Sequence, residues 1–192
     1  MKYLENHLVN LFTLESHTPM EKMKLEYGIK LIISEIGRLL VVYTIAILLG
    51  CLLEVFIAHL TFYVLRQVCF GFHFQTSRQC MVGSILLFPG LCKLTTNLDV
   101  KFILLSIITL VSLLVVMILA PKGTKKHPVI NAAHRKYLKR IIYKRAIILY
   151  GIYLLLPIAF LKFITLGILL QLLMLLLEII NQKKETFFYE MA

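Results

Sequence analysis

The segment Leu65–Cys80 carries the residues whose types are best suited to chemistry. It reads Leu-Arg-Gln-Val-Cys-Phe-Gly-Phe-His-Phe-Gln-Thr-Ser-Arg-Gln-Cys and contains one histidine, two cysteines and two arginines. A histidine close to a cysteine can generate a thiolate nucleophile at neutral pH, because the imidazole accepts the thiol proton and the imidazolium stabilises the anion. Arg66 and Arg78 would add positive potential that also favours the thiolate. These residue types indicate the machinery of a cysteine peptidase, with His73 as the candidate base.

The spacing of these residues decides which cysteine the histidine can reach. His73 and Cys80 are seven residues apart, and on a straight helix they would be separated by roughly 10 Å along the axis. Proton transfer needs an approach of about 3–4 Å, so the chain must turn between them. We therefore expect a helix that ends near Phe70, a re-entrant or irregular piece that carries His73, and Cys80 in the first turns of the next helix. Cys69 lies four residues before His73 and would contact it on an unbroken helix, so geometry alone leaves Cys69 open as a rival nucleophile.

Ordinary explanations exist for the same residues. One histidine and one cysteine within ten residues occur by chance in many proteins, and a loop arginine is usually a topology signal or a lipid contact. The sequence contains no Gly-rich phosphate loop, no HExxH motif and no zinc-ligand set. We therefore predict neither a metal ion nor a cofactor. Glu54 and His59 are further polar residues within apolar segments, where such groups are often functional.

The elements that carry these residues are predicted to lie in a membrane. Of the 192 residues, 59% are hydrophobic, and a chain this short cannot hide that excess in a core. The apolar stretch from Ile29 to Phe70 is too long for one span of about 20 residues and divides most naturally near Gly50–Glu54. The sequence predicts an all-α integral membrane protein with about six transmembrane helices, at about 30–49, 53–69, 79–97, 101–119, 144–161 and 164–181.

Three polar segments complete the predicted organisation of a single multi-pass membrane domain, residues 1–192. Residues 1–28 form an amphipathic N-terminal segment, in which residues 3–16 read as a helix that can lie in the headgroup layer or pack as an ordinary helix. Residues 66–80 are the candidate active-site segment, and residues 120–143 form a strongly basic loop. The net charge is +11, which in a soluble protein would suggest nucleic acid. Here most of the charge flanks apolar runs, which favours contact with anionic lipid headgroups and no nucleic acid partner.

The distribution of lysine and arginine orients the chain. Of the 21 Lys and Arg residues, only Lys93, Lys101 and Lys162 fall on the outer side if the N-terminus is cytoplasmic, and the other 18 fall inside. The positive-inside rule thus predicts a cell-membrane protein with both termini in the cytoplasm. The active-site segment and the basic loop then lie on the same side of the membrane.

Three stretches of the chain resemble one known family. The arrangement Arg66…Gly71-x-His73…Cys80 is similar to the active segment of the accessory gene regulator B (AgrB) family, membrane cysteine peptidases of Gram-positive quorum sensing. Lys-Leu-Glu-Tyr-Gly-Ile at 24–29 resembles the family's Tyr-Gly element, and Ala-Pro-Lys-Gly-Thr-Lys-Lys-His-Pro at 120–128 resembles its basic loop. The motifs occur in the family's order across nearly the whole chain. The chain departs from the family pattern at Phe70, where members often have Gly, and at Phe74, where they often have Ala.

The resemblance implies a specific activity and site. It implies that Cys80 is the nucleophile and His73 its base, that Arg66 and Gly71 support them, and that the basic-loop lysines contribute to processing; these lysines are Lys125 and Lys126. The substrate would be a propeptide of the AgrD type, with an amphipathic leader, a central signal segment and an acidic C-terminal tail. Cleavage before the tail would leave a Cys80 thioester, and ring closure by the propeptide's own Cys or Ser would give a thiolactone or lactone. The family also implies a homodimer in contact with membrane lipids.

A different class of function would leave His73 and Cys80 without a joint role. A small non-catalytic membrane transporter, or a scaffold protein involved in peptide export, would share the apolar spans and the basic loop. Transporters often contain inverted repeats, and no clear repeat is visible in this sequence. The reactivity of Cys80 and its dependence on His73 distinguish the two classes.

Overall fold

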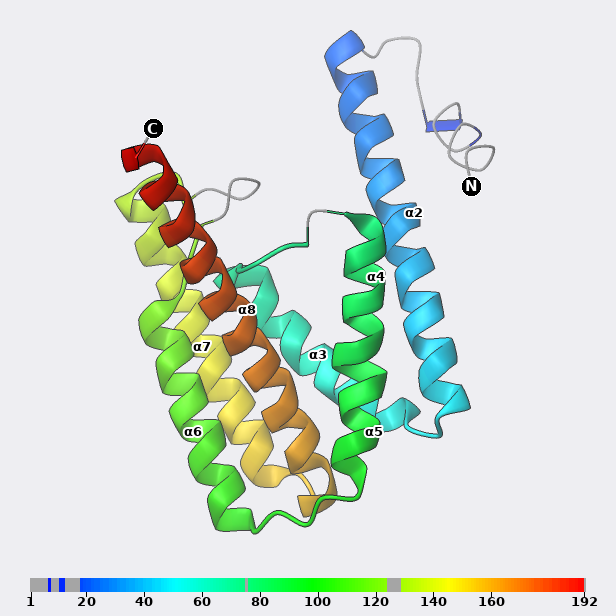
Figure 1. Ribbon diagram of the computed structural model, residues 1–192, viewed down its shortest axis with the longest axis vertical. Helices are drawn as coiled ribbons and strands as arrows, with labels where there is room; N and C mark the ends of the chain where they lie inside the picture. Colours follow the sequence, from blue (N-terminus) through cyan, green and yellow to red (C-terminus); the bar gives the residue numbers. More distant parts are fainter. Residues whose placement is uncertain (1–6, 8–10, 13–17, 75, 124–128, 192) are drawn as a thin grey trace. The chain divides into compact units, whose positions relative to one another are not determined.

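The computed structural model describes residues 7, 11–12, 18–74, 76–123 and 129–191. These residues form helices and, apart from an isolated bridge between Phe70 and Lys122, no β-structure, which confirms the predicted all-α class. The elements in chain order are α2 (Pro19–Leu48), α3 (Leu52–Cys69), α4 (Ser77–Ile85), the π-helix η1 (Leu86–Gly90), α5 (Leu91–Thr96), α6 (Phe102–Leu119), α7 (Ala132–Leu155) and α8 (Ile158–Met191) (Figure 1). The predicted amphipathic helix at 3–16 lies almost entirely outside the described residues.

Among the described residues, five stretches of helix are long and apolar enough to cross a membrane. They are Pro19–Leu48, Leu52–Cys69, Arg78–Thr96, Phe102–Leu119 and Ile158–Lys184. Five of the six predicted spans therefore have a counterpart, but the count of six is not confirmed. The remaining long helix, α7, begins with the basic sequence that follows Asn131, and the charges reduce the apolar length available for crossing. Large apolar side chains on the outer faces of these helices are exposed, including Ile103 and Ile118, as expected where lipid is the solvent.

The boundary between α7 and α8 differs from the predicted one. We expected spans at 144–161 and 164–181, but α7 ends at Leu155 and α8 begins at Ile158. Pro157 explains the difference, because proline disfavours helical backbone angles in the residue before it. Leu156 accordingly has an extended ψ of 152°. Hydropathy does not reveal this boundary, because the residues on both sides of it are apolar.

The predicted third span is one helix with a local change of winding. The π-helix η1 lies between α4 and α5 and contains Pro89. Proline has no backbone N–H for the ordinary helical hydrogen bond, and a π-bulge is one way in which a helix accommodates that loss. The ring of Phe88 contacts His59 at 4.6 Å between centroids and Phe62 at 5.4 Å. These contacts pack the irregular turn against α3.

The chain divides into two compact units, Met1–Ile45 and Ala46–Ala192. In the first unit, α2 starts at a capping box in which the Thr18 backbone N–H donates to the Glu21 carboxylate at 2.8 Å and the Glu21 N–H donates to Thr18 Oγ1 at 3.4 Å. Pro19 occupies the first helical position, where its missing N–H costs nothing. Residues 19–28 are therefore continuous with the first span.

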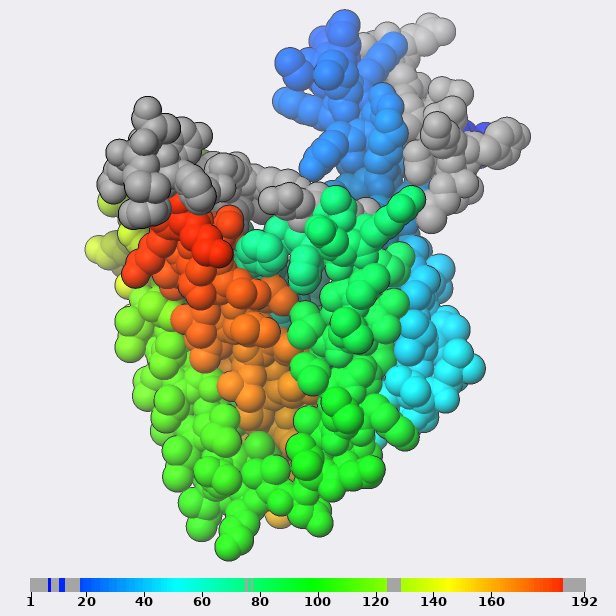
Figure 2. Space-filling model, viewed as in Figure 1, coloured from blue at the N-terminus to red at the C-terminus, as the bar shows by residue number. Residues whose placement is uncertain are grey.

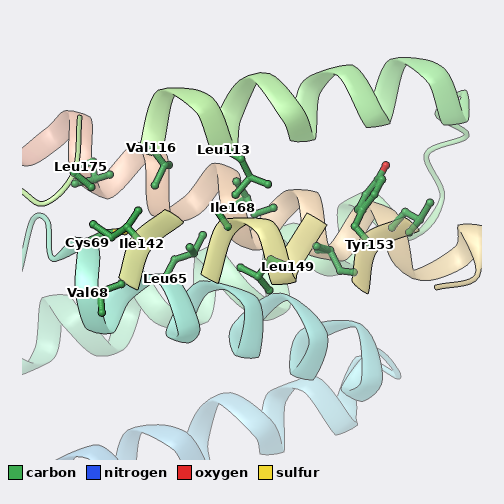
Figure 3. Packing of buried hydrophobic residues seen from close by; sticks show 14 of the residues in the cluster. Leu65, Val68, Cys69, Leu113, Val116, Ile142, Leu149, Tyr153, Ile168 and Leu175 are labelled. Carbon is green, nitrogen blue, oxygen red and sulfur yellow. The ribbon is translucent and has the colours of Figure 1, made fainter. Parts of the chain in front are cut away.

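In the second unit, α3, α6, α7 and α8 pack around one apolar cluster. Figure 3 shows this cluster, which includes Leu65 of α3, Leu113 of α6, Ile142 of α7 and Ile168 of α8. In the space-filling view, α8 is visible as a strip flanked by the α4–α5 segment and α6 (Figure 2). α8 is the most buried of the candidate spans and packs against α3, α6 and α5.

Close approach between α8 and α3 depends on Gly167. A Cβ atom at this position would lie 2.5 Å from the backbone oxygen of Ala58 and 2.9 Å from Thr61 Cβ. Only glycine permits two helix backbones to come this near, which is a common device in membrane-helix packing. On the other side of α8, Thr165 and Thr109 share a hydrogen bond of 2.7 Å between their hydroxyl oxygens. These contacts hold α8 between α3 and α6.

Candidate active site

The helical backbone is interrupted between α3 and α4, in the region where the sequence predicted a break. α3 ends at Cys69, and Phe70 caps it by donating its N–H to the Arg66 carbonyl at 3.2 Å. Phe70 has a φ of +58° and Gly71 a φ of +124°, and residues 71–74 form no regular secondary structure. α3 thus ends near Phe70 and His73 lies on irregular backbone, as predicted, but a re-entrant course of this piece is not confirmed. His73 itself is exposed.

Arg66 holds this irregular segment from the last turn of α3. Its guanidinium donates one hydrogen bond to the Phe70 carbonyl at 3.0 Å and another to the Phe72 carbonyl at 2.5 Å. A planar guanidinium presents two donors in a fixed geometry, so a single side chain can grip two carbonyl groups. The role of Arg66 visible in the structure is therefore to fold the backbone on both sides of Gly71.

Gly71 has no room for a side chain. A Cβ atom would lie 2.7 Å from Arg66 Nη1 and 3.1 Å from the backbone oxygen of Met174. The positive φ of this residue is also one that glycine adopts at little cost. The lack of space and the positive φ both explain why the residue two positions before His73 is a glycine.

Two other elements hold the segment from farther along the chain. The Phe72 N–H donates to the Met174 carbonyl of α8 at 2.9 Å, and Gln171 Nε2 donates to the Phe70 carbonyl at 2.8 Å. The Lys122 N–H donates to the Cys69 carbonyl at 3.2 Å. The segment thus lies against α8 and against the start of the basic loop (Figure 1).

Cys80 lies in the first turns of α4, as expected for the residue after the turn. The helix begins with a capping box in which the Gln79 N–H donates to Thr76 Oγ1 and the Thr76 N–H donates to Gln79 Oε1, both at 3.3 Å. The Cys80 N–H donates to the Thr76 carbonyl at 3.1 Å, and its side chain is partly exposed. Cys80 is thus the fourth residue of α4 and remains partly exposed at the start of the helix.

Cys69 lies in a different environment. Its side chain is fully buried in the apolar cluster, and Figure 3 shows it at the end of α3 near Ile142. Because α3 ends at this residue, the four-residue helical spacing that would join Cys69 to His73 does not form. A substrate could reach this thiol only if the cluster opened.

Charges and aromatic rings surround the segment. The Arg66 guanidinium contacts the segment directly, and α8 contains a buried carboxyl group, Glu178. The rings of Phe72 and Phe74 pack edge to face at 5.5 Å, and the Phe74 ring lies so close to Gly83 that a Cβ there would be 2.8 Å from it. Within the described ranges, no group of three or more His, Cys, Asp or Glu side chains could hold a metal ion.

Comparison with known proteins identifies the family. A family model described as Accessory gene regulator B matches residues 2–175. The chain belongs to the accessory gene regulator B family. Accessory gene regulator protein B of Staphylococcus aureus strain Newman is 33% identical over 181 residues, which cover 92% of this chain and 95% of that protein. The protein of the same name from Staphylococcus intermedius is 32% identical over 171 residues, with 88% and 89% coverage. No solved structure matches the chain.

In this AgrB-family chain, some of the predicted site residues lie on or next to the segment between α3 and α4, and others lie outside the described residues. The Arg66 guanidinium lies against Gly71, and Cys80 lies in the first turns of the helix that follows the His73 segment. The loop lysines Lys125 and Lys126 lie outside the described residues. The sequence did not predict the contact that Gln171 makes with the segment. The signal that could have found it is its position as an isolated amide in the long apolar run of α8, since polar groups in membrane spans tend to be functional.

Proposed function

We propose that this AgrB-family protein is a membrane-embedded cysteine endopeptidase in quorum-sensing processing, with Cys80 as nucleophile and His73 as general base. Its substrate is an AgrD-like propeptide, from which it removes the C-terminal tail. The observation that carries the proposal is the folded segment between α3 and α4, which Arg66 and α8 hold just before the capped start of the Cys80 helix. That arrangement supplies the turn that a His73–Cys80 pair requires.

The proposed reaction has two acyl-transfer steps. His73 accepts the proton of the Cys80 thiol, and the thiolate attacks the carbonyl carbon of the peptide bond before the tail. The C–N bond breaks, the tail leaves as an amine that takes the proton from His73, and the signal segment stays on Cys80 as a thioester. The propeptide's own thiol or hydroxyl then attacks the thioester carbonyl. The proton of the attacking group passes to His73, the C–S bond to Cys80 breaks as a thiolactone or lactone forms, and the released Cys80 thiolate takes back the proton.

Exclusion of water is needed for the second step, because hydrolysis of the thioester would waste the acyl bond before the ring closes. The edge-to-face pair of Phe72 and Phe74 flanks His73 in sequence, and Phe74 packs over Gly83 of α4. Apolar rings at this position support a site that a peptide can enter more readily than bulk water. Contact of the same rings with lipid is compatible with this role.

The proposal is tested by replacing His73 and following both steps with a synthetic propeptide. We expect His73→Gln to reduce tail release by about 10²–10⁴-fold, the usual contribution of a general base. Wild-type protein should yield a Cys80 acyl-thioester that mass spectrometry detects and hydroxylamine releases. The matched control is His59→Gln, which alters a histidine of α3 that packs on Phe88 and should retain most activity. Equal activity of the two variants, or no thioester, would favour the transporter or scaffold alternative.

The basic loop is proposed to recognise the acidic tail of the propeptide. We expect the double variant Lys125→Ala, Lys126→Ala to raise KM about two- to tenfold for a propeptide with an acidic tail, since each exposed ion pair contributes up to about 1 kcal/mol. The effect should shrink at high salt because exposed charges are screened. A propeptide with a neutralised tail should be processed equally by the variant and the wild type. The control pair is Lys183→Ala with Lys184→Ala, two exposed lysines of α8. Equal loss on both substrates contradicts charge recognition.

We further propose that both termini and the basic loop face the cytoplasm. The described basic residues near the loop lie at the same end of the second unit as the catalytic segment, since Lys122 bonds to the Cys69 carbonyl and Arg145 to Gln67 at 2.8 Å. At the opposite end, Lys93 and Lys162 donate to backbone carbonyls. Reporter fusions after the last residue and within 120–143 should therefore show cytoplasmic activity. An external location of the loop would overturn both the topology and the site that depends on it.

A further inference from the structure

An amide side chain of α8, Gln171, contacts the backbone of the segment that carries His73. Gln171 is fully buried, and its Nε2 donates a hydrogen bond of 2.8 Å to the carbonyl of Phe70, about a hundred residues earlier in the chain. Its Oε1 is buried as well and has no hydrogen-bond partner among the described residues. The amide nitrogen of Gln171 is therefore hydrogen-bonded and the amide oxygen is not.

An amide in this position is costly for the fold. A buried oxygen without a partner loses its hydration and receives nothing in return, whereas an apolar side chain of the same size would avoid that loss. The neighbours of Gln171 in α8 are almost all apolar, so hydrophobic packing would be well served by leucine or methionine. The contact that distinguishes glutamine from these residues is its bond to the Phe70 carbonyl.

The carbonyl that Gln171 contacts belongs to a strained residue. Phe70 has a φ of +58°, a conformation that residues with a side chain rarely adopt and that persists only where surrounding contacts enforce it. Two donors grip its oxygen, Nη1 of Arg66 from α3 and Nε2 of Gln171 from α8. One turn farther along α8, the Met174 carbonyl accepts the N–H of Phe72. Gln171 and Met174 thus form a docking platform on one face of α8, and His73 is the next residue after the docked stretch.

We propose that Gln171 is a positioning residue for His73. By holding the Phe70 carbonyl on α8, it fixes the backbone that leads into His73. This inference rests on the proposed function of His73 and Cys80. In this arrangement α8 positions the proposed base, His73, although α8 itself contributes no reacting group.

The first test measures whether Gln171 holds the segment. Gln171→Met keeps the volume of the side chain and removes the donor. Amide hydrogen exchange of a peptide that covers residues 70–74 should become about five- to tenfold faster, the equivalent of one lost hydrogen bond. The matched control is Thr165→Val, which removes a buried hydrogen bond between α8 and α6 without touching the segment. The inference is wrong if the two variants leave the exchange of this peptide equally slow.

The second test measures whether loss of the Gln171–Phe70 hydrogen bond impairs the function of His73 as a base. The rate of iodoacetamide alkylation of Cys80, followed by mass spectrometry, is compared at about pH 6 and about pH 8.5. A well-placed His73 keeps the rate at the lower pH high, and His73→Ala abolishes that advantage. Gln171→Met should move the rate ratio toward that of His73→Ala and lower kcat for tail release by roughly 10–100-fold with little change in KM, since misplacement by 1 Å can cost on the order of 10²-fold. Thr165→Val should match the wild type in both measurements.

The outcomes separate the inference from the function on which it rests. If His73→Ala leaves the ratio unchanged, the proposed function fails. If His73→Ala lowers the ratio but Gln171→Met does not, the function stands and the positioning role is overturned. Gln171→Asn retains an amide but is too short to reach Phe70, so a folded Gln171→Asn protein with wild-type values would likewise overturn it.

Discussion

Replacing Cys80 with serine is expected to abolish propeptide cleavage, with a loss on the order of 10³-fold or more, whereas Cys69→Ala should leave most of the activity. The first loss follows from the proposed mechanism, because a serine hydroxyl is a much weaker nucleophile than a cysteine thiolate and its introduction would remove the covalent step. The second expectation follows from position, since Cys69 is fully buried in the apolar cluster and Cys80 is partly exposed. Tail release from a synthetic propeptide measures both.

The comparison needs a control for folding. Cys69→Ala opens a small cavity in the cluster, so its thermal stability in detergent is measured beside its activity. Cys92→Ala, which alters another fully buried cysteine outside the segment, gives the reference for a loss due to packing alone. A stable but inactive Cys69→Ala protein together with an active Cys80→Ser protein would reverse the assignment of the nucleophile.

Gly71→Ala should nearly eliminate activity through the backbone alone. The added Cβ would meet Arg66 Nη1 at 2.7 Å and the Met174 backbone at 3.1 Å, and alanine is strained at a φ of +124°. We expect the free energy of unfolding to fall by about 1–3 kcal/mol and tail release by roughly 100-fold, because the segment must move away from α8. Thermal unfolding and the cleavage assay measure these two effects.

Gly151 provides the matched control for this substitution. It lies inside α7, and a Cβ there would meet nothing within 4 Å. Gly151→Ala should therefore be neutral or slightly stabilising, since alanine favours a helix interior over glycine by up to about 1 kcal/mol. Wild-type cleavage by Gly71→Ala would show that the observed conformation of the segment is not the active one.

The strain at Phe70 gives a physical meaning to one departure from the family pattern. The resemblance drawn from the sequence implies glycine as a common residue at the position of Phe70, and in this chain Phe70 has a positive φ. Glycine would adopt the same backbone without strain. In this chain the bonds from Arg66 and Gln171 to the Phe70 carbonyl hold the conformation instead.

Most of the membrane-spanning helices could be predicted from the sequence, because the hydropathy of a segment depends only on the residues within it. The span predicted at 101–119 corresponds to α6, Phe102–Leu119, and the span predicted at 53–69 corresponds to α3. The break near Phe70 was also predicted from the hypothesis that His73 and Cys80 act together, because side chains seven residues apart cannot meet on a straight helix. The boundary at Pro157 was missed because apolarity continues across it, and a break in backbone geometry then leaves no trace in a hydropathy pattern.

What the sequence by itself determined was the all-α membrane class, the family and the short list of residues able to do chemistry. Those properties depend on composition, on local periodicity and on motifs, all of which are readable along the chain. Only the tertiary structure decided that α8 supports the segment before His73, through Gln171 and the Met174 carbonyl. It also decided that Cys69 belongs to the core while Cys80 remains accessible. Both outcomes depend on which helices pack together, and a contact across a hundred residues depends on packing that no local pattern encodes.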